Sequence, residues 1–311
     1  MSKDALAGTA EDRAVGALVG LAVGDAVGTT LEFKPPGTFT PITDMVGGGP
    51  FRLKPGQFTD DTSMAMCLAE SILHAGDLDP ADQLSRYVEW WRNGYWSSTG
   101  ICFDIGGTTT RALSRFESYG SVIDADTNPE DAANGSLMRL APVPIRWWTD
   151  VAEAAERSGR SSTTTHAAAR PVDACRAYGA MIAATIAGTP FDDVLDPGFW
   201  HYGELHPAVE EVVRGSWRTK QPPAIRGTGY VVDAMEAALW AVAGADDFAA
   251  AVLRAANLGD DADTTAAIAG QLAGARFGCS GIPPRWRDLL SEGDRIAAIA
   301  ADLFRAGGGG S

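Results

Sequence analysis

Two clusters of carboxylates with adjacent hydroxyls stand out in this sequence, and each precedes an apolar run. One is Leu-Gly-Asp-Asp-Ala-Asp-Thr-Thr at residues 258–265, and the other is Phe-Thr-Asp-Asp-Thr-Ser-Met at residues 58–64. One interpretation is helix capping, because Asp and Thr are good N-caps and negative charge suits a helix N-terminus. However, a cap needs one acceptor oxygen, and crowded carboxylates raise one another's pKa unless a cation lies among them.

The ligand types in these clusters also indicate which ions to expect. Carboxylate and hydroxyl oxygens suit hard divalent cations such as Mg²⁺, Mn²⁺ or Ca²⁺ rather than zinc. The four Cys residues are scattered and form no Cys-x-x-Cys pair, so the sequence has no zinc-type spacing. We therefore predict that the two clusters, although far apart in the chain, meet in the fold and bind divalent cations.

Composition limits the classes of protein to consider. With 311 residues, of which 45% are hydrophobic, the chain can form one large domain or two ordinary ones. The net charge of −15 argues against a nucleic-acid-binding surface, and an anionic substrate needs a metal ion or a local Arg to offset the repulsion. The scattered Cys residues, the polar N-terminus and an apolar segment (residues 14–23) too short to cross a bilayer predict a cytoplasmic protein without a membrane span.

The first apolar run, residues 13–28, reads as a buried helix. Its glycines recur every four residues and so form one stripe of small side chains, which predicts close packing against another helix. The stripe consists of Gly16, Gly20, Gly24 and Gly28. Asp25 in the same run is a carboxylate in apolar company, and Glu32 lies in the loop that follows.

The rest of the chain reads as Ala-rich helices. No alternating strand, hairpin signature or fixed-period repeat is visible. We expect an all-α fold with a single domain at residues 12–306. Residues 1–11 and the Gly/Ser-rich residues 307–311 are expected to be flexible tails.

Three further segments have both a functional and a structural interpretation. The Gly- and hydroxyl-rich stretch at residues 103–111 opens a helix, and main-chain N–H groups at such a start can bind an anion. The Asn-Gly-Ser turn at residues 134–136 is either a plain turn or a set of N–H groups for a phosphate. His166 ends a run of hydroxyls that we expect to cap a helix reaching residue 186, and it is either a structural histidine or a ligand contact.

Seven short motifs, taken in order, resemble those of ADP-ribosylglycohydrolases. They are Gly-Asp-Ala-Val-Gly (24–28), Phe-Thr-Asp-Asp-Thr (58–62), Phe-Asp-Ile-Gly (103–106), Asn-Gly-Ser-Leu-Met-Arg (134–139), Thr-His (165–166), Gly-Tyr (229–230) and Gly-Asp-Asp-Ala-Asp-Thr-Thr (259–265). The resemblance covers about residues 12–305 and is greatest to the bacterial dinitrogenase reductase-activating glycohydrolases. The two acidic motifs are specific as a pair.

The resemblance implies a compact, orthogonal all-α helical bundle with a binuclear metal site, so two Mg²⁺ (or Mn²⁺) ions are the expected cofactors. The implied metal ligands are Thr59, Asp60, Asp61, Asp261, Asp263 and Thr264. The implied catalytic residues are Asp104 and Glu32, together with Asp61 and Asp261. The implied substrate contacts are Asn134, Gly135, Ser136, His166 and Tyr230. Many members have Gly where this chain has Asp260 and Ala133, so Asp260 is left out of the ligand set.

The activity implied is hydrolysis of the N-glycosidic bond between ADP-ribose and a protein side chain, with ADP-ribosyl-arginine as the leading expectation. The partners would be an ADP-ribosylated protein and the product ADP-ribose. Serine-linked ADP-ribose, O-acetyl-ADP-ribose and reversal of an ADP-ribosylating toxin are alternatives. Other readings are a catalytically silent ADP-ribose-binding or packing protein, and a metal phosphohydrolase that cleaves the pyrophosphate. Both acidic clusters are intact, which favours an enzyme.

Overall fold

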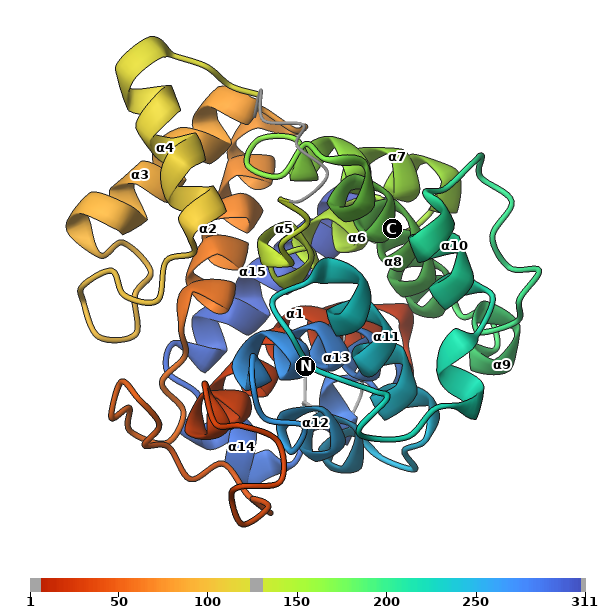
Figure 1. The fold of residues 1–311 in the computed structure, drawn as a ribbon. Coiled ribbons are helices and arrows are strands. Elements are labelled where there is room, and N and C mark those ends of the chain that lie inside the picture. Colours follow the sequence, from red (N-terminus) through yellow and green to blue (C-terminus); the bar gives the residue numbers. More distant parts are fainter. Residues whose placement is uncertain (1–6, 124–130, 309–311) are drawn as a thin grey trace.

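The computed structural model describes residues 7–123 and 131–308, and these residues form a helical bundle (Figure 1). Two isolated β-bridges are the only strand-like pairings among them. The longer helices are α1 (Ala10–Gly28), α2 (Asp60–Ala75), α3 (Pro80–Asn93), α4 (Gly107–Tyr119), α7 (Val151–Ser162), α8 (Ala169–Ala187), α11 (Val231–Ala243), α12 (Phe248–Ala256), α13 (Ala262–Phe277) and α15 (Gly293–Ala306). The shorter ones are α5 (Gly135–Met138), α6 (Pro142–Arg146), α9 (Phe191–Val194), α10 (Pro207–Val213) and α14 (Pro284–Leu289). The predicted all-α fold is confirmed.

Helices α1 and α13 pack backbone to backbone at the centre of the bundle. A methyl group added to Gly16, Gly20 or Gly24 would overlap a main-chain carbonyl of α13. The arrangement is reciprocal, because Gly270 and Gly274 of α13 lie equally close to carbonyls of α1. The glycine stripe therefore has the packing role that its spacing predicts, and only Gly fits along this seam.

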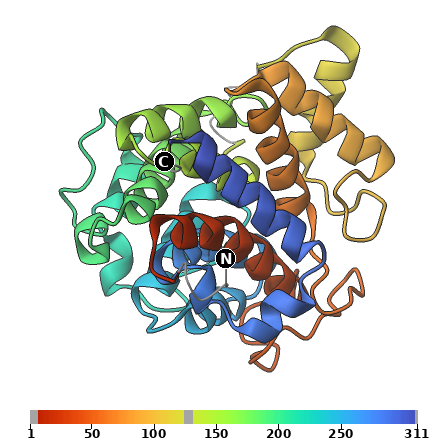
Figure 2. The same cartoon turned by 180° about the vertical axis from the view of Figure 1, so that it is seen from behind.

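Other helices cover this central pair. Helix α15 packs on α1 and α2, and Figure 2 shows α15 beside α1 on the face turned away in Figure 1. Helices α11 and α12 pack against α13, and α8 contacts α13 as well as α1. Helix α13 is buried almost all round, as expected for a helix with small apolar side chains on every face.

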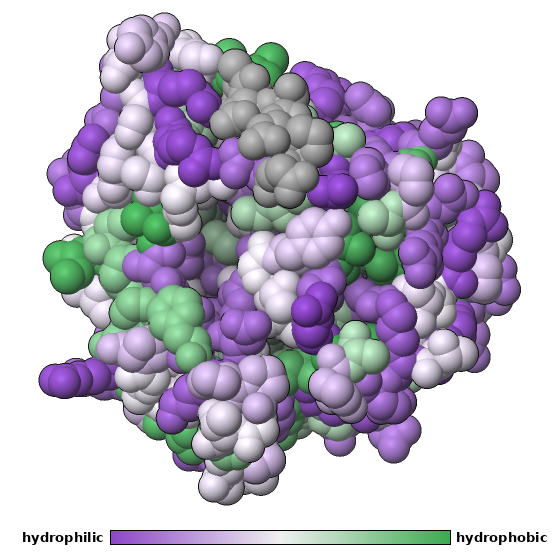
Figure 3. Space-filling model, in the orientation of Figure 1, coloured by the Kyte–Doolittle hydropathy of each residue, from purple (hydrophilic) through white to green (hydrophobic). Residues whose placement is uncertain are grey.

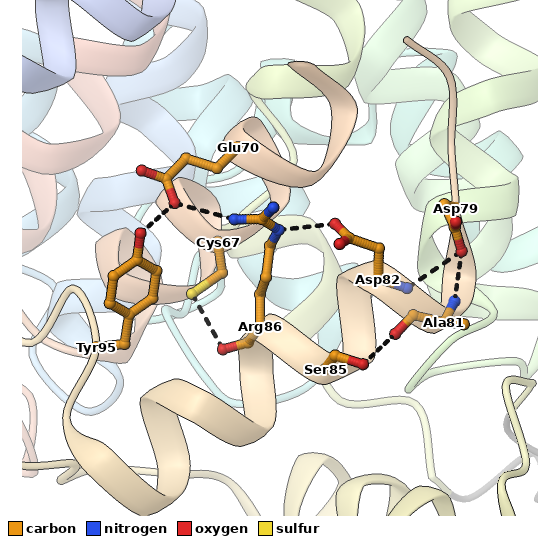
Figure 4. Close-up of polar contacts among 8 residues, drawn as sticks. All are labelled: Cys67, Glu70, Asp79, Ala81, Asp82, Ser85, Arg86 and Tyr95. Atoms are coloured by element: carbon orange, nitrogen blue, oxygen red, sulfur yellow. Dashed lines mark hydrogen bonds and ion pairs between the residues drawn. The ribbon is translucent and has the colours of Figure 1, made fainter. Parts of the chain in front are cut away.

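Helix α3 is attached to α2 partly by polar contacts at the edge of the bundle (Figure 4). Arg86 of α3 donates to Glu70 of α2 at 3.2 Å and to Asp82 one turn earlier at 2.7 Å. Tyr95 also donates to Glu70, at 2.5 Å, and the Cys67 thiol donates to the main-chain carbonyl of Arg86. These contacts hold α3 and the loop after it against the helix that begins at the first acidic cluster.

One expected helix boundary was wrong. The hydroxyl run before His166 does not cap a helix, because α7 continues to Ser162 and α8 begins only at Ala169. The hydroxyls bond backward instead: Thr163 donates to the carbonyl of Arg160 at 2.8 Å, and Thr164 donates to that of Ser161 at 3.0 Å. Such backward bonds close the end of α7, whereas α8 follows Ala168 at its N-cap position and has no side-chain capping bond.

The chain ends differ slightly from the expected tails. Helix α1 begins at Ala10, where Thr9 caps it by accepting from the N–H of Asp12 at 3.1 Å. The outer parts of both expected tails, residues 1–6 and 309–311, lie outside the described residues. The helical stretch Ala10–Leu31 is long and apolar enough to cross a membrane, contrary to the length expected from the sequence, but 94% of its apolar window is buried inside the fold.

Candidate metal centre and substrate cavity

Asp25 of α1 holds the start of α2. Its carboxylate is fully buried and accepts from the main-chain N–H groups of Thr59, at 2.9 Å, and Thr62, at 3.1 Å. The hydroxyls of both threonines donate to it as well, at 2.9 and 2.6 Å. Neither Thr59 before α2 nor Asp261 before α13 makes a side-chain capping bond to its own helix. The capping interpretation of the two acidic clusters is therefore wrong, and α2 is capped from α1.

The two acidic helix starts meet at Asp263. Oxygen atoms of Asp25, Asp61 and Asp263 lie within 4.8 Å of one another, and so do those of Glu32, Asp261 and Asp263. Asp263 belongs to both groups, so the groups are adjacent. The prediction that two distant clusters meet in the fold is confirmed.

The atoms of these groups fit a divalent cation. Oδ1 of Asp61 and Oδ2 of Asp263 are buried and have no hydrogen-bond partner among the described residues. A buried carboxylate oxygen without a partner is costly, so such atoms point to an ion or water that satisfies them. The donor set consists of oxygen atoms only, which suits Mg²⁺, Mn²⁺ or Ca²⁺.

The electrostatics of the cluster also favour a cation. Burial and the neighbouring charge of Asp263 raise the pKa of Asp25 to about 7, although hydrogen bonds from Thr59 and Thr62 oppose the rise. The same two causes raise the pKa of Asp261 to about 7. Burial and the surrounding carboxylates also raise the pKa values of Asp60 and Asp61 well above their usual range. Without a cation, the ionised forms of these carboxylates are destabilised both by the loss of solvent and by their mutual repulsion.

A cavity of about 300 Å³ opens onto the carboxylates. Residues from seven parts of the chain line it, among them Glu32, Asp60, Asp104, Asn134, Gly135, His166, Gly229, Asp261, Asp263 and Thr264. Figure 3 shows the face turned toward the viewer in Figure 1, on which hydrophilic and apolar groups lie side by side. The volume and lining suit a polar ligand of moderate size.

Glu32 and Asp104 are two of the acids that line the cavity. Glu32 is 5% exposed, and its carboxylate accepts from the N–H of Asp263 at 3.4 Å. Burial, followed by the charges of Asp263 and Asp25, raises the pKa of Asp104 to about 9. Burial and Asp263 also raise the pKa of Glu32 far above its usual value. Each acid can therefore hold a proton at neutral pH in the metal-free cavity.

The backbone beside the acids is strained. Phe33, Asp104 and Asp260 adopt φ values of 60°, 62° and 60°, a region that costs a non-glycine residue about 1–3 kcal/mol. Two main-chain bonds hold the first of these strained loops: Phe33 donates to the carbonyl of Asp260 at 2.7 Å, and Asp260 donates to that of Lys34 at 2.8 Å. This pairing joins the Glu32 loop to the loop before α13, so the two acidic segments cannot move apart independently.

The cavity is also lined by Asn134, Gly135 and His166. The Asn134 side-chain amide donates to Asp261 at 2.7 Å, which ties this turn to the acidic cluster. The His166 ring lies against Gly135, where an added methyl carbon would be 2.9 Å from Cε1. Burial and the charges of Arg139 and Arg111 lower the pKa of His166 to about 3, so the imidazole is neutral.

Comparison with known proteins agrees with this geometry. A family profile described as ADP-ribosylglycohydrolase matches residues 7–310. The chain belongs to the ADP-ribosylglycohydrolase family. The expected resemblance is confirmed over residues 7–310, and the protein is a glycohydrolase of this family.

Several relatives cover most of the chain. A Serratia proteamaculans protein named ADP-ribosylarginine hydrolase Tri1 is 45% identical over 94% of this chain and 79% of its own length. The ADP-ribosyl-[dinitrogen reductase] glycohydrolase of Rhodospirillum rubrum is 31% identical over 93% of this chain and 97% of its own. A solved structure titled ADP-ribosylglycohydrolase-related protein complex is 39% identical, with a TM-score of 0.85 over 96% of this chain and 99% of that chain.

The structure of this ADP-ribosylglycohydrolase places most of the expected residues together. Asp60, Asp261, Asp263 and Thr264 line the cavity, as do Glu32, Asp104, Asn134, Gly135 and His166. Thr59 and Asp61 lie just beneath, where the Thr59 hydroxyl contacts Asp61 at 3.0 Å.

Two of the expected substrate contacts are not among the residues that line the cavity. The Ser136 hydroxyl is buried and accepts from Ser162 at 2.7 Å, so it does not reach the cavity. Tyr230 is not among the lining residues either; it precedes α11 and pairs with Ala133 in a β-bridge, and Arg170 lies 5.7 Å from its ring centroid.

The sequence interpretation did not include Asp25 and Phe33 in the site. The signal for Asp25 was its charge inside an apolar, glycine-striped helix, which has no packing reason. Phe33 is 64% exposed and lines the cavity, and no pattern in the sequence distinguishes it from a core phenylalanine.

Proposed function

We propose that this protein is a divalent-metal-dependent ADP-ribosyl-arginine hydrolase that releases ADP-ribose from modified protein side chains. The observation that carries the proposal is the pair of carboxylate groups sharing Asp263, with unpartnered buried oxygens, at the base of a cavity. Two relatives named ADP-ribosylarginine hydrolase, at 45% and 43% identity, support arginine as the linked side chain.

The surroundings of the cavity favour a cationic leaving group. Phe33, Phe51 and Phe103 form a row of aromatic rings, with centroids 6.3 Å apart between the first two and 5.0 Å apart between the last two. We call these three rings the aromatic shelf. Phe33 of this shelf lines the cavity together with Glu32 and Asp104, and these two acids are the chain neighbours of Phe33 and Phe103. Aromatic faces and carboxylates together attract a guanidinium, whereas the neutral oxygen of a serine linkage gains nothing from either.

The residues of the site would have the following roles. Asp25, Asp61 and Asp263 would hold one ion, and Glu32, Asp261 and Asp263 would hold a second, most simply Mg²⁺ or Mn²⁺. Such ions can orient the hydroxyls of a sugar and lower the pKa of water bound to them. Asp104, or Glu32 where it does not hold the second ion, would transfer a proton to the leaving nitrogen or from water, because both carboxyl groups line the cavity. The positive charge developing at ribose C1 would be stabilised by the remaining carboxylates.

A substrate comparison tests this proposal. Purified protein is incubated with ADP-ribosyl-arginine protein and, separately, with serine-linked and O-acetyl-ADP-ribose, each with Mg²⁺ or with EDTA. We expect free ADP-ribose from the arginine linkage only, and only with Mg²⁺. Release of AMP would identify a phosphohydrolase, and tight binding of ADP-ribose without turnover of any linkage would identify a silent binding protein. Either result would contradict the proposal.

A further inference from the structure

Arg139 is a buried cation without a carboxylate partner. It follows α5 directly, its side chain is fully buried, and no ion pair involves it within residues 7–123 and 131–308. Its guanidinium donates to the carbonyl of Gly135 at 3.1 Å and to the Thr165 hydroxyl at 2.7 Å, and it lies 4.9 Å from the centroid of the Tyr87 ring. Burying an unpaired charge costs several kcal/mol, so an Arg in this place calls for a reason beyond packing.

The hydrogen bonds around Arg139 determine which group donates and which accepts in a short hydrogen-bonded chain. A guanidinium can only donate, so the Thr165 hydroxyl accepts from it. The same hydroxyl lies 2.7 Å from Nδ1 of His166. The Thr165 hydroxyl has one proton, and His166 Nδ1 is the acceptor within reach, so Thr165 donates to Nδ1. If Nδ1 donated instead, the Thr165 proton would have no acceptor among the described residues.

A neutral imidazole that accepts at Nδ1 must carry its proton on Nε2. That nitrogen has no hydrogen-bond partner in the described part of the chain, and His166 lines the cavity beside Asn134 and Gly135. The remaining charged groups lining the cavity are carboxylates, which repel an anion. The His166 end is therefore where a donor N–H, with the positive charge of Arg139 behind it, faces the cavity.

We propose that Arg139 and Thr165 are positioning residues that lock His166 in the Nε2–H tautomer, so that it donates a hydrogen bond to a phosphate oxygen of ADP-ribose. This rests on the proposed function for the identity of the ligand, but the tautomer itself does not depend on which linkage is cleaved. The unscreened charge of Arg139 adds attraction for the pyrophosphate in a protein whose net charge is −15. A purely structural Arg139 would hold α5 but would be indifferent to the tautomer.

The first test reads the tautomer directly. Nitrogen-15 NMR of histidine-labelled protein at pH 7 gives the protonation of each ring nitrogen, and with four His residues the His166 signal is assigned from a His166→Gln variant. We expect Nε2 protonated and Nδ1 unprotonated in the free protein. A His166 protonated at Nδ1 would overturn the inference, and this measurement needs no other variant to fold.

The second test compares Thr165→Val, which keeps the shape and removes the hydroxyl, with Thr165→Ser, which keeps the hydroxyl. The dissociation constant of ADP-ribose is measured by calorimetry in Mg²⁺. We expect Val to weaken binding roughly tenfold, as for loss of a hydrogen bond to a charged group, and to give a mixture of His166 tautomers. Ser should stay within about twofold of the parent. Equal affinities for parent and Val would refute the role in binding, whereas a parent that binds no ADP-ribose would refute the proposed function and leave the tautomer result standing.

Discussion

The clearest consequence of the acidic cluster is that metal removal should destabilise the protein increasingly as the pH rises. Asp25 is fully buried, and its pKa is raised from 3.8 to about 7. Because the folded-state pKa lies above the unfolded one, the folded protein binds more protons between pH 4 and 7. The contribution of Asp25 to metal-free stability is therefore fully present below pH 4 and is lost as the pH rises through that window.

The size of the effect follows from the same numbers. The change in the pKa of Asp25, at 1.36 kcal/mol per unit, corresponds to about 4 kcal/mol. With about 2.1 cal/mol/K of unfolding entropy per residue over 311 residues, this is a shift in Tm of about 6 °C. A bound divalent cation replaces the protons, and about two of the three pKa units lie between pH 5 and pH 7. The difference in Tm between Mg²⁺ and EDTA should therefore be about 4 °C larger at pH 8 than at pH 5.

The assay is differential scanning calorimetry at pH 5, 6, 7 and 8, in Mg²⁺ and in EDTA at constant ionic strength. The matched control is an Asp61→Asn/Asp263→Asn double variant, in which the effect of Mg²⁺ and its dependence on pH should both disappear. If the Tm difference between Mg²⁺ and EDTA were the same at pH 5 and pH 8, or if the metal-free Tm rose over this range, the reasoning about the buried carboxylates would be wrong.

Three further outcomes are expected. Asp61→Asn and Asp263→Asn, each measured by release of ADP-ribose, should lower kcat about 100-fold or more, because each removes an unpartnered oxygen of the cluster; near-normal rates would place the metal elsewhere. Phe33→Leu should raise KM for ADP-ribosyl-arginine about two- to fivefold while Phe33→Tyr stays near the parent, since cation–π attraction at an exposed site is about 0.5–1 kcal/mol; equal effects of Leu and Tyr would argue against the aromatic shelf. Gly20→Ala should lower the free energy of unfolding in urea by about 1–3 kcal/mol or more. Gly107→Ala should be neutral or stabilising, because an added methyl there meets only the end of the Arg111 side chain at 3.7 Å; a neutral Gly20→Ala would contradict the backbone seam.

Features that show up as a local pattern of residues could be predicted from the sequence. The glycine spacing of α1 predicted its packing, because a stripe of four glycines on one helix face has few other uses. The acidic motifs predicted a shared site, because neither cluster is stable without a positive partner. Asp104, Glu32, Asn134 and His166 came from the family resemblance, and the structure brings them to one cavity.

The sequence could not show in which direction a side chain points, or which residues distant in the chain form hydrogen bonds with it. The motif around Ser136 does not show that this hydroxyl turns toward Ser162 and away from the cavity. The hydroxyls at residues 163–165 have the composition of a helix cap, but they bond backward to α7 or sideways to His166. Asp25 could be recognised as unusual, but its role depends on Thr59 and Thr62, which only the fold brings to it.

The close packing of α1 against α13 also explains why the site needs a cation. At the C-terminal end of the seam, Gly28 lies against the main chain of Ala262 and Asp263, and Asp25 lies one turn earlier on the same helix. Moving α1 and α13 apart to relieve repulsion between Asp25 and Asp263 would break the close main-chain packing along the seam. The seam therefore keeps two buried carboxylates close together. Their electrostatic repulsion is offset either by protonation or by a bound divalent ion. A substitution that widened the seam near Gly24 would be expected to weaken metal binding without changing any ligand, because the ligands would move apart together with the helices.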